Sequence, residues 1–250
     1  AAAMPADVIM NGVVGVVGLR PVMEALKQGT SVAIANKEPL VAAGALVKKT
    51  AEEHGTTIIP VDSEHNGLFQ IFDKTQYDEI VRIVLTASGG PFLSWDLKQM
   101  KEATPKQAVA HPRWSMGAKI SVDSATMVNK ALEVIEAYHL FDMKPGKIDV
   151  LIHPQSTIHA MVEYSDGTVL AHMGACDMHT PITYALSYPK RMKTPGNGLD
   201  WFSLMQLDFK FIDTKRFPAV TKAYECLEAG QYACIAFNAA NEVAVQAFLD

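Results

Sequence analysis

Residues 111–136 read HPRWSMGAKISVDSATMVNKALEVIE, a loop of small and polar residues that passes into a helix with two different faces. Ser124 is the expected N-cap of this helix, because a serine hydroxyl accepts hydrogen bonds from the free backbone N–H groups of a first turn. A narrow polar stripe follows at helical spacing, and apolar residues fill the opposite side. The stripe consists of Thr126, Asn129, Lys130 and Glu133.

The polar stripe has the composition of an anion site next to a cation site. Serine, asparagine and lysine beside a helix N-terminus suit a phosphate group. The carboxylate of Glu133 suits a hard divalent cation. The alternative is a solvated helix face on which Lys130 and Glu133 form an ordinary i,i+3 ion pair. The stripe alone does not decide between the two interpretations.

The composition narrows the class of protein. With 250 residues, 49% hydrophobic and 20% charged, the chain is typical of a soluble globular protein with one large or two modest domains. A net charge of −5 argues against nucleic acid or an anionic membrane as the main partner. Three cysteines without a C-x-x-C pair, no apolar run of about 18 residues and no basic N-terminal region favour a reducing, cytoplasmic location.

The first 60 residues alternate between strand and helix. An apolar segment from residue 7 is followed by a helix over 21–29, a strand over 31–36 and a helix from Pro39 to Gly55. This alternation predicts a parallel, doubly wound sheet. Gly12, Gly15 and Gly18 do not form the G-x-G-x-x-G pattern of a dinucleotide site and are more typical of close packing.

Polar clusters follow the strands, where ligands of parallel sheets bind. Asp62 and Glu64 follow the strand at 56–61, and the two-residue period of a strand places both on one side. Two carboxylates in a buried crevice repel each other unless a cation or proton lies between them, and a cation is the simpler solution. The other clusters are Asn36, Lys37 and Glu38 after the strand at 31–36, Ser63 between the two carboxylates, and Ser88, Gly89 and Gly90 after a third strand at 79–87.

The second half of the chain shows a different pattern. Residues 114–117, WSMG, suit a mobile lid that closes over a ligand. From residue 147 strands dominate, and two of them are joined by a Ser165-Asp166-Gly167 hairpin turn. His153, His159 and His172 lie on these strands without metal-ligand spacing, so we expect packing or surface roles. The final helix has no stop signal, which suggests an incomplete domain.

Six segments, spread over the whole length of the chain, resemble 1-deoxy-D-xylulose-5-phosphate reductoisomerase. They are ANKEPLV (35–41), PVDSEHN (60–66), LTASGGPF (85–92), residues 111–137, IHPQSTIHAMVEY (152–164) and FNAANEVAVQAF (237–248). The resemblance implies NADPH-dependent formation of 2-C-methyl-D-erythritol 4-phosphate in the non-mevalonate pathway of isoprenoid biosynthesis, with Mg²⁺ or Mn²⁺. It further implies retro-aldol and aldol steps followed by hydride transfer, and a homodimer.

The same resemblance implies an α/β fold in three parts. Residues 1–62 correspond to the C-terminal part of a Rossmann-like, NADPH-binding parallel-sheet domain. Residues 63–188 correspond to an α/β catalytic domain with a mixed sheet. A linker over 189–213 then leads to the start of a C-terminal helical domain at 214–250.

The resemblance also assigns roles to single residues. Asp62, Glu64 and Glu133 match the metal ligands and are expected to be catalytic, together with Lys37 and His111. Asn36, Glu38, Met116 and Gly117 match or adjoin the cofactor contacts. The residues implied in substrate binding are Lys37, Ser63, Glu64, Ser88, His111, Trp114, Ser124, Asn129, Lys130, Glu133 and Met178, and Ser88, Ser124, Asn129 and Lys130 are expected to hold the phosphate end.

The sequence departs from the family pattern in a few places. Pro39 replaces a serine, Gly67 stands where alanine is common, and Arg113 replaces an asparagine of the lid. The glycine-rich phosphate loop that begins family members has no equivalent here, and only the start of the final helical bundle is expected. The chain is therefore expected to be a fragment or a partial sequence.

Two other functions stay open at this point. A metal-dependent sugar-phosphate lyase or isomerase without nicotinamide would not need the phosphate loop, and a cofactor titration would distinguish it. A truncated binding or dimerisation fragment would hold metal and phosphate without turnover. The mass of the natural gene product would test that truncation.

Overall fold

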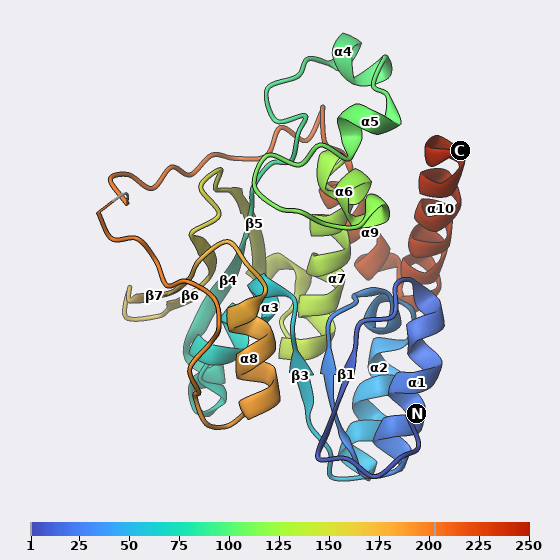
Figure 1. The fold of residues 1–250 in the computed structure, drawn as a ribbon, viewed down its shortest axis with the longest axis vertical. Coiled ribbons are helices and arrows are strands. Elements are labelled where there is room, and N and C mark those ends of the chain that lie inside the picture. The colour runs from blue at the N-terminus through green and yellow to red at the C-terminus, as the bar shows by residue number, and fades with distance from the viewer. Residues whose placement is uncertain (1, 203) are drawn as a thin grey trace.

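Two sheets form the framework of the computed structural model, which describes residues 2–202 and 204–250. The first, sheet A, is parallel with the order β1-β2-β3 and contains β1 (Val8–Asn11), β2 (Ser31–Ile34) and β3 (Ile58–Pro60). The second, sheet B, has the order β5-β4-β6-β7. It contains β4 (Ile80–Ala87), β5 (Ile148–Ile152), β6 (Ile158–Tyr164) and β7 (Val169–Met173). Figure 1 shows sheet B to the left of the central helix α7 (Val128–Phe141) and sheet A below it.

Sheet A confirms the predicted strand–helix alternation. Helices α1 (Leu19–Lys27) and α2 (Glu38–Glu53) connect its parallel strands. Their apolar residues pack with Val32 and Ile34 of β2 in one buried cluster. Burial on both sides of a parallel strand requires such a continuous apolar run.

Sheet B contains the third predicted strand and is the mixed sheet that the resemblance implied for this part of the chain. The segment at 79–87 forms β4, which pairs in parallel with β5 and antiparallel with β6. Its neighbours come from residues about 65 to 85 positions further along the chain, so local periodicity could not identify them. The hairpin between β6 and β7 turns at 165–167 as predicted, with Gly167 at a positive φ of 85°.

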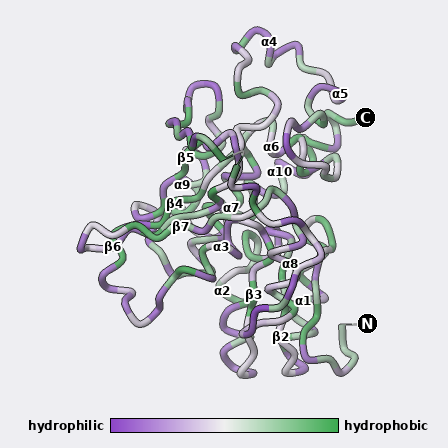
Figure 2. The backbone as a smooth tube through the Cα atoms, turned by 60° about the vertical axis from the view of Figure 1, so that its left-hand side comes forward, coloured by the Kyte–Doolittle hydropathy of each residue, from purple (hydrophilic) through white to green (hydrophobic). Residues whose placement is uncertain are grey.

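The remaining helices surround the sheets. The hydrophobic stretches of the chain run through the middle of the molecule, whereas the segment around α4 is largely hydrophilic and stands away from it (Figure 2). The helices not yet given are α3 (Ser63–Ile71), α4 (Leu97–Lys101), α5 (Pro105–Ala108), α6 (Ala118–Ala125), α8 (His179–Ser187), α9 (Ala219–Ala229) and α10 (Gln231–Leu249), with 3₁₀ turns η1 (Val16–Gly18), η2 (Lys74–Glu79) and η3 (Pro145–Lys147).

The predicted N-cap at Ser124 is wrong. Ser124 lies in the last turn of α6, and the chain then breaks at Met127, which adopts a left-handed conformation with φ of 63°. The next helix, α7, begins only at Val128. Two helices therefore follow each other with only Thr126 and Met127 between them. The polarity pattern of the sequence does not distinguish this arrangement from a loop followed by one helix.

The mixed α/β fold is confirmed, with a parallel sheet, a mixed sheet and a helical end formed by α9 and α10. The residue boundaries of the three predicted domains stay a prediction. No helix among the described residues is both long enough and apolar enough to span a bilayer.

The burial of His139 leads us to expect that part of the free energy of folding is lost in acid. His139 lies on α7, is only 7% exposed and packs so closely on α2 that a Cβ at Gly44 would lie 2.2 Å from its ring. Burial, and then the nearby Lys48, lower the pKa of His139 to about 4, while Asp142 opposes the shift. Between pH 6.5 and 4 the unfolded chain therefore binds the extra proton, so folding free energy present above pH 6.5 is lost as pH falls.

We expect His139→Gln to remove this component, which corresponds to about 3 kcal/mol between pH 7 and pH 4. The variant should be less stable than the parent at pH 7 because the ring contacts are lost, and the gap should narrow or reverse at pH 4.5. Urea unfolding at both values measures it. An equal gap at the two pH values would show that the ring is protonated without cost.

Candidate functional site

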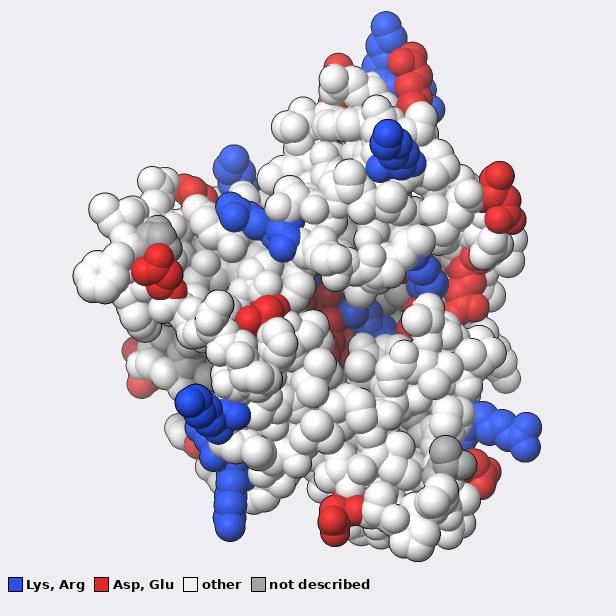
Figure 3. Space-filling view, in the orientation of Figure 1, with Lys and Arg blue, Asp and Glu red and all other residues white. Residues whose placement is uncertain are grey.

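Charged side chains meet at the floor of a hollow near the centre of the molecule (Figure 3). This first hollow has a volume of about 890 Å³ and lies where β3, β4, the loop at 111–117 and the start of α7 come together. The structure brings into it nearly every residue predicted to bind substrate. Its polar lining includes Lys37, Asp62, Ser63, Glu64, Ser88, His111, Ser115, Ser124, Asn129, Lys130 and Ser156, and its apolar lining includes Trp114, Met116 and Met178.

Asp62 and Glu64 reach the hollow by a different route from the predicted one. Strand β3 ends at Pro60, and Asp62 is the N-cap of α3. Its Oδ1 accepts hydrogen bonds from the backbone N–H groups of Glu64 and His65, at 3.2 and 3.3 Å. The strand alternation assumed for these residues is therefore wrong, and a helix cap holds them at the hollow instead.

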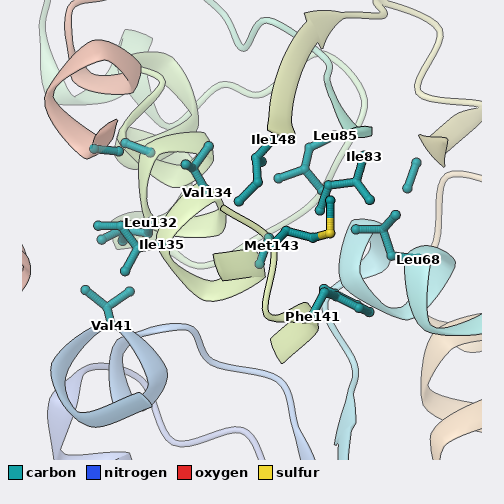
Figure 4. Close-up of a cluster of buried hydrophobic side chains, with 14 of the residues drawn as sticks. Val41, Leu68, Ile83, Leu85, Leu132, Val134, Ile135, Phe141, Met143 and Ile148 are labelled. Carbon is teal, nitrogen blue, oxygen red and sulfur yellow. The ribbon is translucent and has the colours of Figure 1, made fainter. Parts of the chain in front are cut away.

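Glu133 lies just beneath the floor, fully buried on α7. The apolar side of the helix, including Leu132, Val134 and Ile135, packs into the largest buried cluster of the described residues (Figure 4). This packing holds the helix against sheet B and α2 and fixes the direction of its polar side. The carboxylate of Glu133 accepts from Asn129 Nδ2 at 2.6 Å and from Lys130 Nζ at 2.5 Å.

Two lysines connect the three carboxylates. Lys37 Nζ lies 2.6 Å from Asp62 Oδ2 and 3.9 Å from Glu133 Oε1. Lys130 Nζ lies 2.5 Å from Glu133 Oε2 and 3.5 Å from Glu64 Oε2. Both lysine side chains are 6% exposed, so the ammonium groups bridge the carboxylates in a low-dielectric environment. The carboxylates predicted to share one cation thus lie together around shared positive charge.

Burial and neighbouring charges set the ionisation of the floor. Burial, followed by the charge of Asp62, raises the pKa of Glu133 to about 8. For Asp62 burial opposes ionisation, but Lys37 and then His65 keep its pKa well below the usual range. For Lys37 burial favours the neutral form, yet Asp62 and Glu133 hold its pKa well above the usual value. Glu133 is thus the carboxylate that most needs additional positive charge.

His65 belongs to this cluster, although no pattern in the sequence indicated it. The Asp62, His65 and Glu133 side chains carry possible ligand atoms within 4.8 Å of one another. Both ring nitrogens of His65 are already used, because Nδ1 lies 2.8 Å from Asp62 Oδ1 and Nε2 lies 3.0 Å from the carbonyl oxygen of Glu133. Both partners are acceptors, so both ring nitrogens donate and the ring is positively charged. His65 therefore orients Asp62 and is not free to bind a metal. The buried carboxylate of Glu136, 3.5 Å from Nδ1 of His65, stabilises this positive charge.

A second group of donors surrounds Ser88. His111 Nδ1 accepts from the backbone N–H groups of Arg113 and Trp114 at 3.1 and 2.9 Å. Its Nε2 therefore carries the proton and donates to Ser88 Oγ at 3.0 Å. Burial lowers the pKa of His111, which agrees with a neutral ring. Since Ser88 Oγ accepts from His111, its own proton is available to an anion.

Glycines allow the turn after β4 to approach α6 closely. A Cβ at Gly90 would lie 2.5 Å from the carbonyl oxygen of Ser124, and Gly90 has a positive φ of 65°. The close approach places Ser88 and Ser124 in the same hollow as Asn129 and Lys130. The latter two lie in the first turn of α7, where free backbone N–H groups and the helix dipole favour an anion.

A second hollow adjoins the first and gathers the predicted cofactor contacts. Its volume is about 740 Å³, and its lining includes Asn36, Glu38 and Gly117. Met116, which was grouped with them, instead lines the first hollow. The two hollows share Ala35, Lys37, Ile120 and Asn129. A ligand in one therefore lies beside a ligand in the other.

One further residue of the first hollow was missed, and one buried histidine lies beside a residue of its lining. Ser156 lines the first hollow with a positive φ of 51° and follows the carboxyl end of β5, so the rule that ligands bind beyond strand ends could have identified it. His159 was expected to have a packing or surface role. It is 3% exposed and its Nδ1 lies 3.8 Å from Glu64 Oε1, so it contacts a predicted metal ligand.

Comparison with protein families gives three matches. Residues 1–44 match the family description 1-deoxy-D-xylulose 5-phosphate reductoisomerase. Residues 58–141 match the C-terminal domain of 1-deoxy-D-xylulose 5-phosphate reductoisomerase, and residues 173–250 match the description DXP reductoisomerase C-terminal domain. Together they cover most of the chain.

Individual proteins agree with the family matches. The chain is 54% identical over 250 residues to the 1-deoxy-D-xylulose 5-phosphate reductoisomerases of Zymomonas mobilis and Rhodospirillum centenum, and it spans 64% and 62% of their lengths. A crystal structure of DOX-P reductoisomerase in complex with NADPH, fosmidomycin and magnesium shows 47% identity and a TM-score of 0.96, covering 99% of this chain and 63% of that one. The Zymomonas mobilis enzyme in complex with NADPH gives 51% identity and a TM-score of 0.93, covering 100% and 64%.

Proposed function

The chain belongs to the 1-deoxy-D-xylulose 5-phosphate reductoisomerase family, and from this premise we propose that it contributes the catalytic part of that activity. The reaction rearranges the carbon skeleton of 1-deoxy-D-xylulose 5-phosphate and reduces the resulting aldehyde to give 2-C-methyl-D-erythritol 4-phosphate. NADPH is the hydride donor, one proton is taken up, and Mg²⁺ or Mn²⁺ is required. This places the protein in non-mevalonate isoprenoid biosynthesis.

One observation carries the proposal. The first hollow is lined by the carboxylates of Asp62 and Glu64, with Glu133 beneath its floor, and by serine, asparagine and lysine donors of the kind that bind phosphate. It shares a wall with a second hollow. A sugar phosphate and a nicotinamide cofactor bound side by side would use both. Neither a simple phosphate-binding site nor a simple metal site needs such a pair of hollows.

The donor set fits a hard divalent cation. Asp62, Glu64 and Glu133 offer only oxygen atoms, which Mg²⁺ and Mn²⁺ prefer, whereas zinc prefers nitrogen and sulfur. His65 already holds Oδ1 of Asp62, so Oδ2 is the oxygen that faces Lys37 and the site. The cation, when bound, stabilises negative charge developing on substrate oxygens, and the cofactor supplies the hydride.

The lysines and the phosphate donors have separate tasks. Lys37 contacts both Asp62 and Glu133, so its ammonium group can donate hydrogen bonds to the reacting oxygens of the substrate. Ser88, with its proton directed away from His111, and Ser124, Asn129 and Lys130 hold the phosphate end. This remote grip does not react, but it orients the other end of the substrate and helps the loop with Trp114 exclude water.

The remaining assignments concern assembly and location. We assign a homodimer, consistent with the edge position of β7, where Val169 and Leu170 are 52% and 43% exposed. A cytoplasmic location fits the free Cys176, Cys226 and Cys234. Asn36, Glu38, Met116 and Gly117 are the proposed nicotinamide-nucleotide contacts, with Met116 on the side of the sugar phosphate.

The proposal is tested by incubating the purified chain with NADPH, the sugar phosphate and Mg²⁺ or Mn²⁺. We expect loss of NADPH absorbance that needs both the sugar phosphate and the cation and stops on chelation. Consumption of the sugar phosphate without NADPH oxidation would instead support a nicotinamide-independent lyase or isomerase. Binding of cation and phosphate with no consumption at all would support a non-catalytic fragment.

A further inference from the structure

The segment FNAANEVAVQAF resembles the family but lies outside both hollows. It forms most of α10, a helix that packs against α2 and α6 beside the second hollow (Figure 1). Two consecutive residues of the segment, Asn241 and Glu242, turn polar atoms toward this junction. Each begins a chain of contacts that ends on a proposed cofactor residue.

The first chain of contacts runs from Asn241 to Glu38. Asn241 Nδ2 donates to Asp123 Oδ1 at 2.9 Å. The other oxygen of Asp123 lies 2.7 Å from Lys119 Nζ, and the same ammonium lies 3.0 Å from Glu38 Oε1. The carboxylates of Asp123 and Glu38 are 3% and 9% exposed, so water competes little for these bonds. Three elements, α10, α6 and α2, are thereby connected.

The second chain of contacts runs from Glu242 to Asn36. Glu242 Oε1 accepts from the backbone N–H of Val16 at 3.1 Å and from Asn238 Nδ2 at the same distance. The loop that carries Val16 is held from its other side by Asn36, whose Nδ2 donates to the carbonyl oxygen of Gly15 at 3.2 Å. Asn36 Oδ1 accepts in turn from Asn11 at 2.8 Å. Glu242 and Asn36 thus hold the same short loop between them.

We propose that Asn241 and Glu242 are positioning residues for nicotinamide-nucleotide binding, which they support through Glu38 and Asn36 without touching the cofactor. The inference rests on the proposed function, because the roles of Asn36 and Glu38 come from it. In this account α10 supports the active site from outside. It fixes the position of the start of α2, which carries Glu38, relative to α6, which follows the lid at 114–117. Among the described residues, the side-chain hydrogen bonds of Asn241 and Glu242 reach Asp123, Val16 and Asn238, none of which is a proposed phosphate donor.

The variants Asn241→Ala and Glu242→Ala each remove one chain of contacts. Loss of one or two hydrogen bonds corresponds to about a 2- to 10-fold weaker affinity for NADPH. Glu242→Gln keeps an acceptor oxygen in place and should recover most of the affinity. Asn241→Asp sets a second carboxylate against Asp123 and should weaken binding more than alanine does. Gln246→Ala is the matched control, since Gln246 is exposed on the same helix and its side chain donates a hydrogen bond to Asp250, away from both chains of contacts.

Two measurements on the purified chain test the inference. Hydrogen–deuterium exchange without ligand should show faster exchange at residues 15–18 in Glu242→Ala and at 36–38 in Asn241→Ala. Titration followed by NADPH fluorescence should show the affinity changes, while the KM for the sugar phosphate stays within about twofold. Unchanged exchange and unchanged NADPH affinity in both variants would overturn the inference, as would an equal rise in the KM for the sugar phosphate, which indicates general loosening. Absence of NADPH binding by the unmodified chain overturns the proposed cofactor and the inference with it.

Discussion

Glu133→Gln is expected to abolish metal-dependent turnover while leaving the fold intact. Glutamine has nearly the size and shape of glutamate and keeps one acceptor oxygen for the donors Asn129 and Lys130, so the packing of α7 is retained. The metal-free variant should therefore unfold at nearly the same temperature as the parent. With a divalent cation the two differ, because an amide cannot supply the anionic oxygen that the cation needs.

We expect kcat/KM to fall by roughly three orders of magnitude, which is about 4 kcal/mol of lost transition-state stabilisation. The assay is NADPH oxidation at saturating Mn²⁺, paired with Mn²⁺ affinity and a thermal unfolding curve. Glu53→Gln is the matched control, because Glu53 is an exposed glutamate that contacts Lys49 and lines neither hollow. Near-normal turnover in Glu133→Gln would refute the assignment of Glu133 as a ligand.

Lys130→Ala is expected to weaken binding of the sugar phosphate far more than it slows the chemical steps. Lys130 is buried at the N-terminus of α7, and its ammonium lies beside Glu64 and Glu133. Removing it takes away a charge-assisted donor to phosphate and leaves the two carboxylates with less compensation. We expect the KM for the sugar phosphate to rise by about 10- to 100-fold, with a smaller change in kcat.

The KM for NADPH serves as an internal reference for this variant and should stay close to that of the parent. Lys98→Ala removes an exposed lysine of α4 and controls for the loss of net charge. Unchanged KM and kcat in Lys130→Ala would mean that the side chain is only a structural counter-charge of α7.

The site was predicted more accurately than the local structure that builds it. Asp62 and Glu64 do approach Glu133, but through the N-cap of α3 and not through strand alternation. The error did not move the side chains away, because a helix that starts beyond a strand end leaves its first turn at the same edge of the sheet. Ser124 shows the same separation. It lines the hollow as predicted although it lies at the end of one helix and not at the start of another.

Contacts between distant segments could not be predicted from local patterns. Strand β4 obtains its neighbours from β5 and β6, so nothing in the segment itself indicates that it belongs to a second sheet. His65 was overlooked for a related reason. Its role depends on Asp62, three residues away, and on the carbonyl oxygen of Glu133, which lies 68 positions further along the chain.

The contacts of the two lysines with the carboxylates also could not be predicted from the sequence. The sequence suggested a cation between carboxylates and a phosphate held by Lys130, which are separate functions. The structure shows Lys37 and Lys130 bridging the carboxylates themselves. Charge compensation within the floor therefore explains how acidic groups can be buried together in the folded chain. It also suggests that cation binding and phosphate binding support each other, because a cation that takes the place of Lys130 at the carboxylates leaves its ammonium group free for the phosphate.

The central claim is that Asp62, Glu64 and Glu133 share one divalent cation next to a phosphate clamp. Crystals grown with Mn²⁺ and the sugar phosphate test it most directly, because the anomalous signal of manganese locates the ion independently of the protein phases. We predict one strong peak in contact with oxygens of all three carboxylates, with the phosphate beside Ser88 and Lys130. A peak ligated by His65 without Glu64, or no peak in the first hollow, would contradict the account.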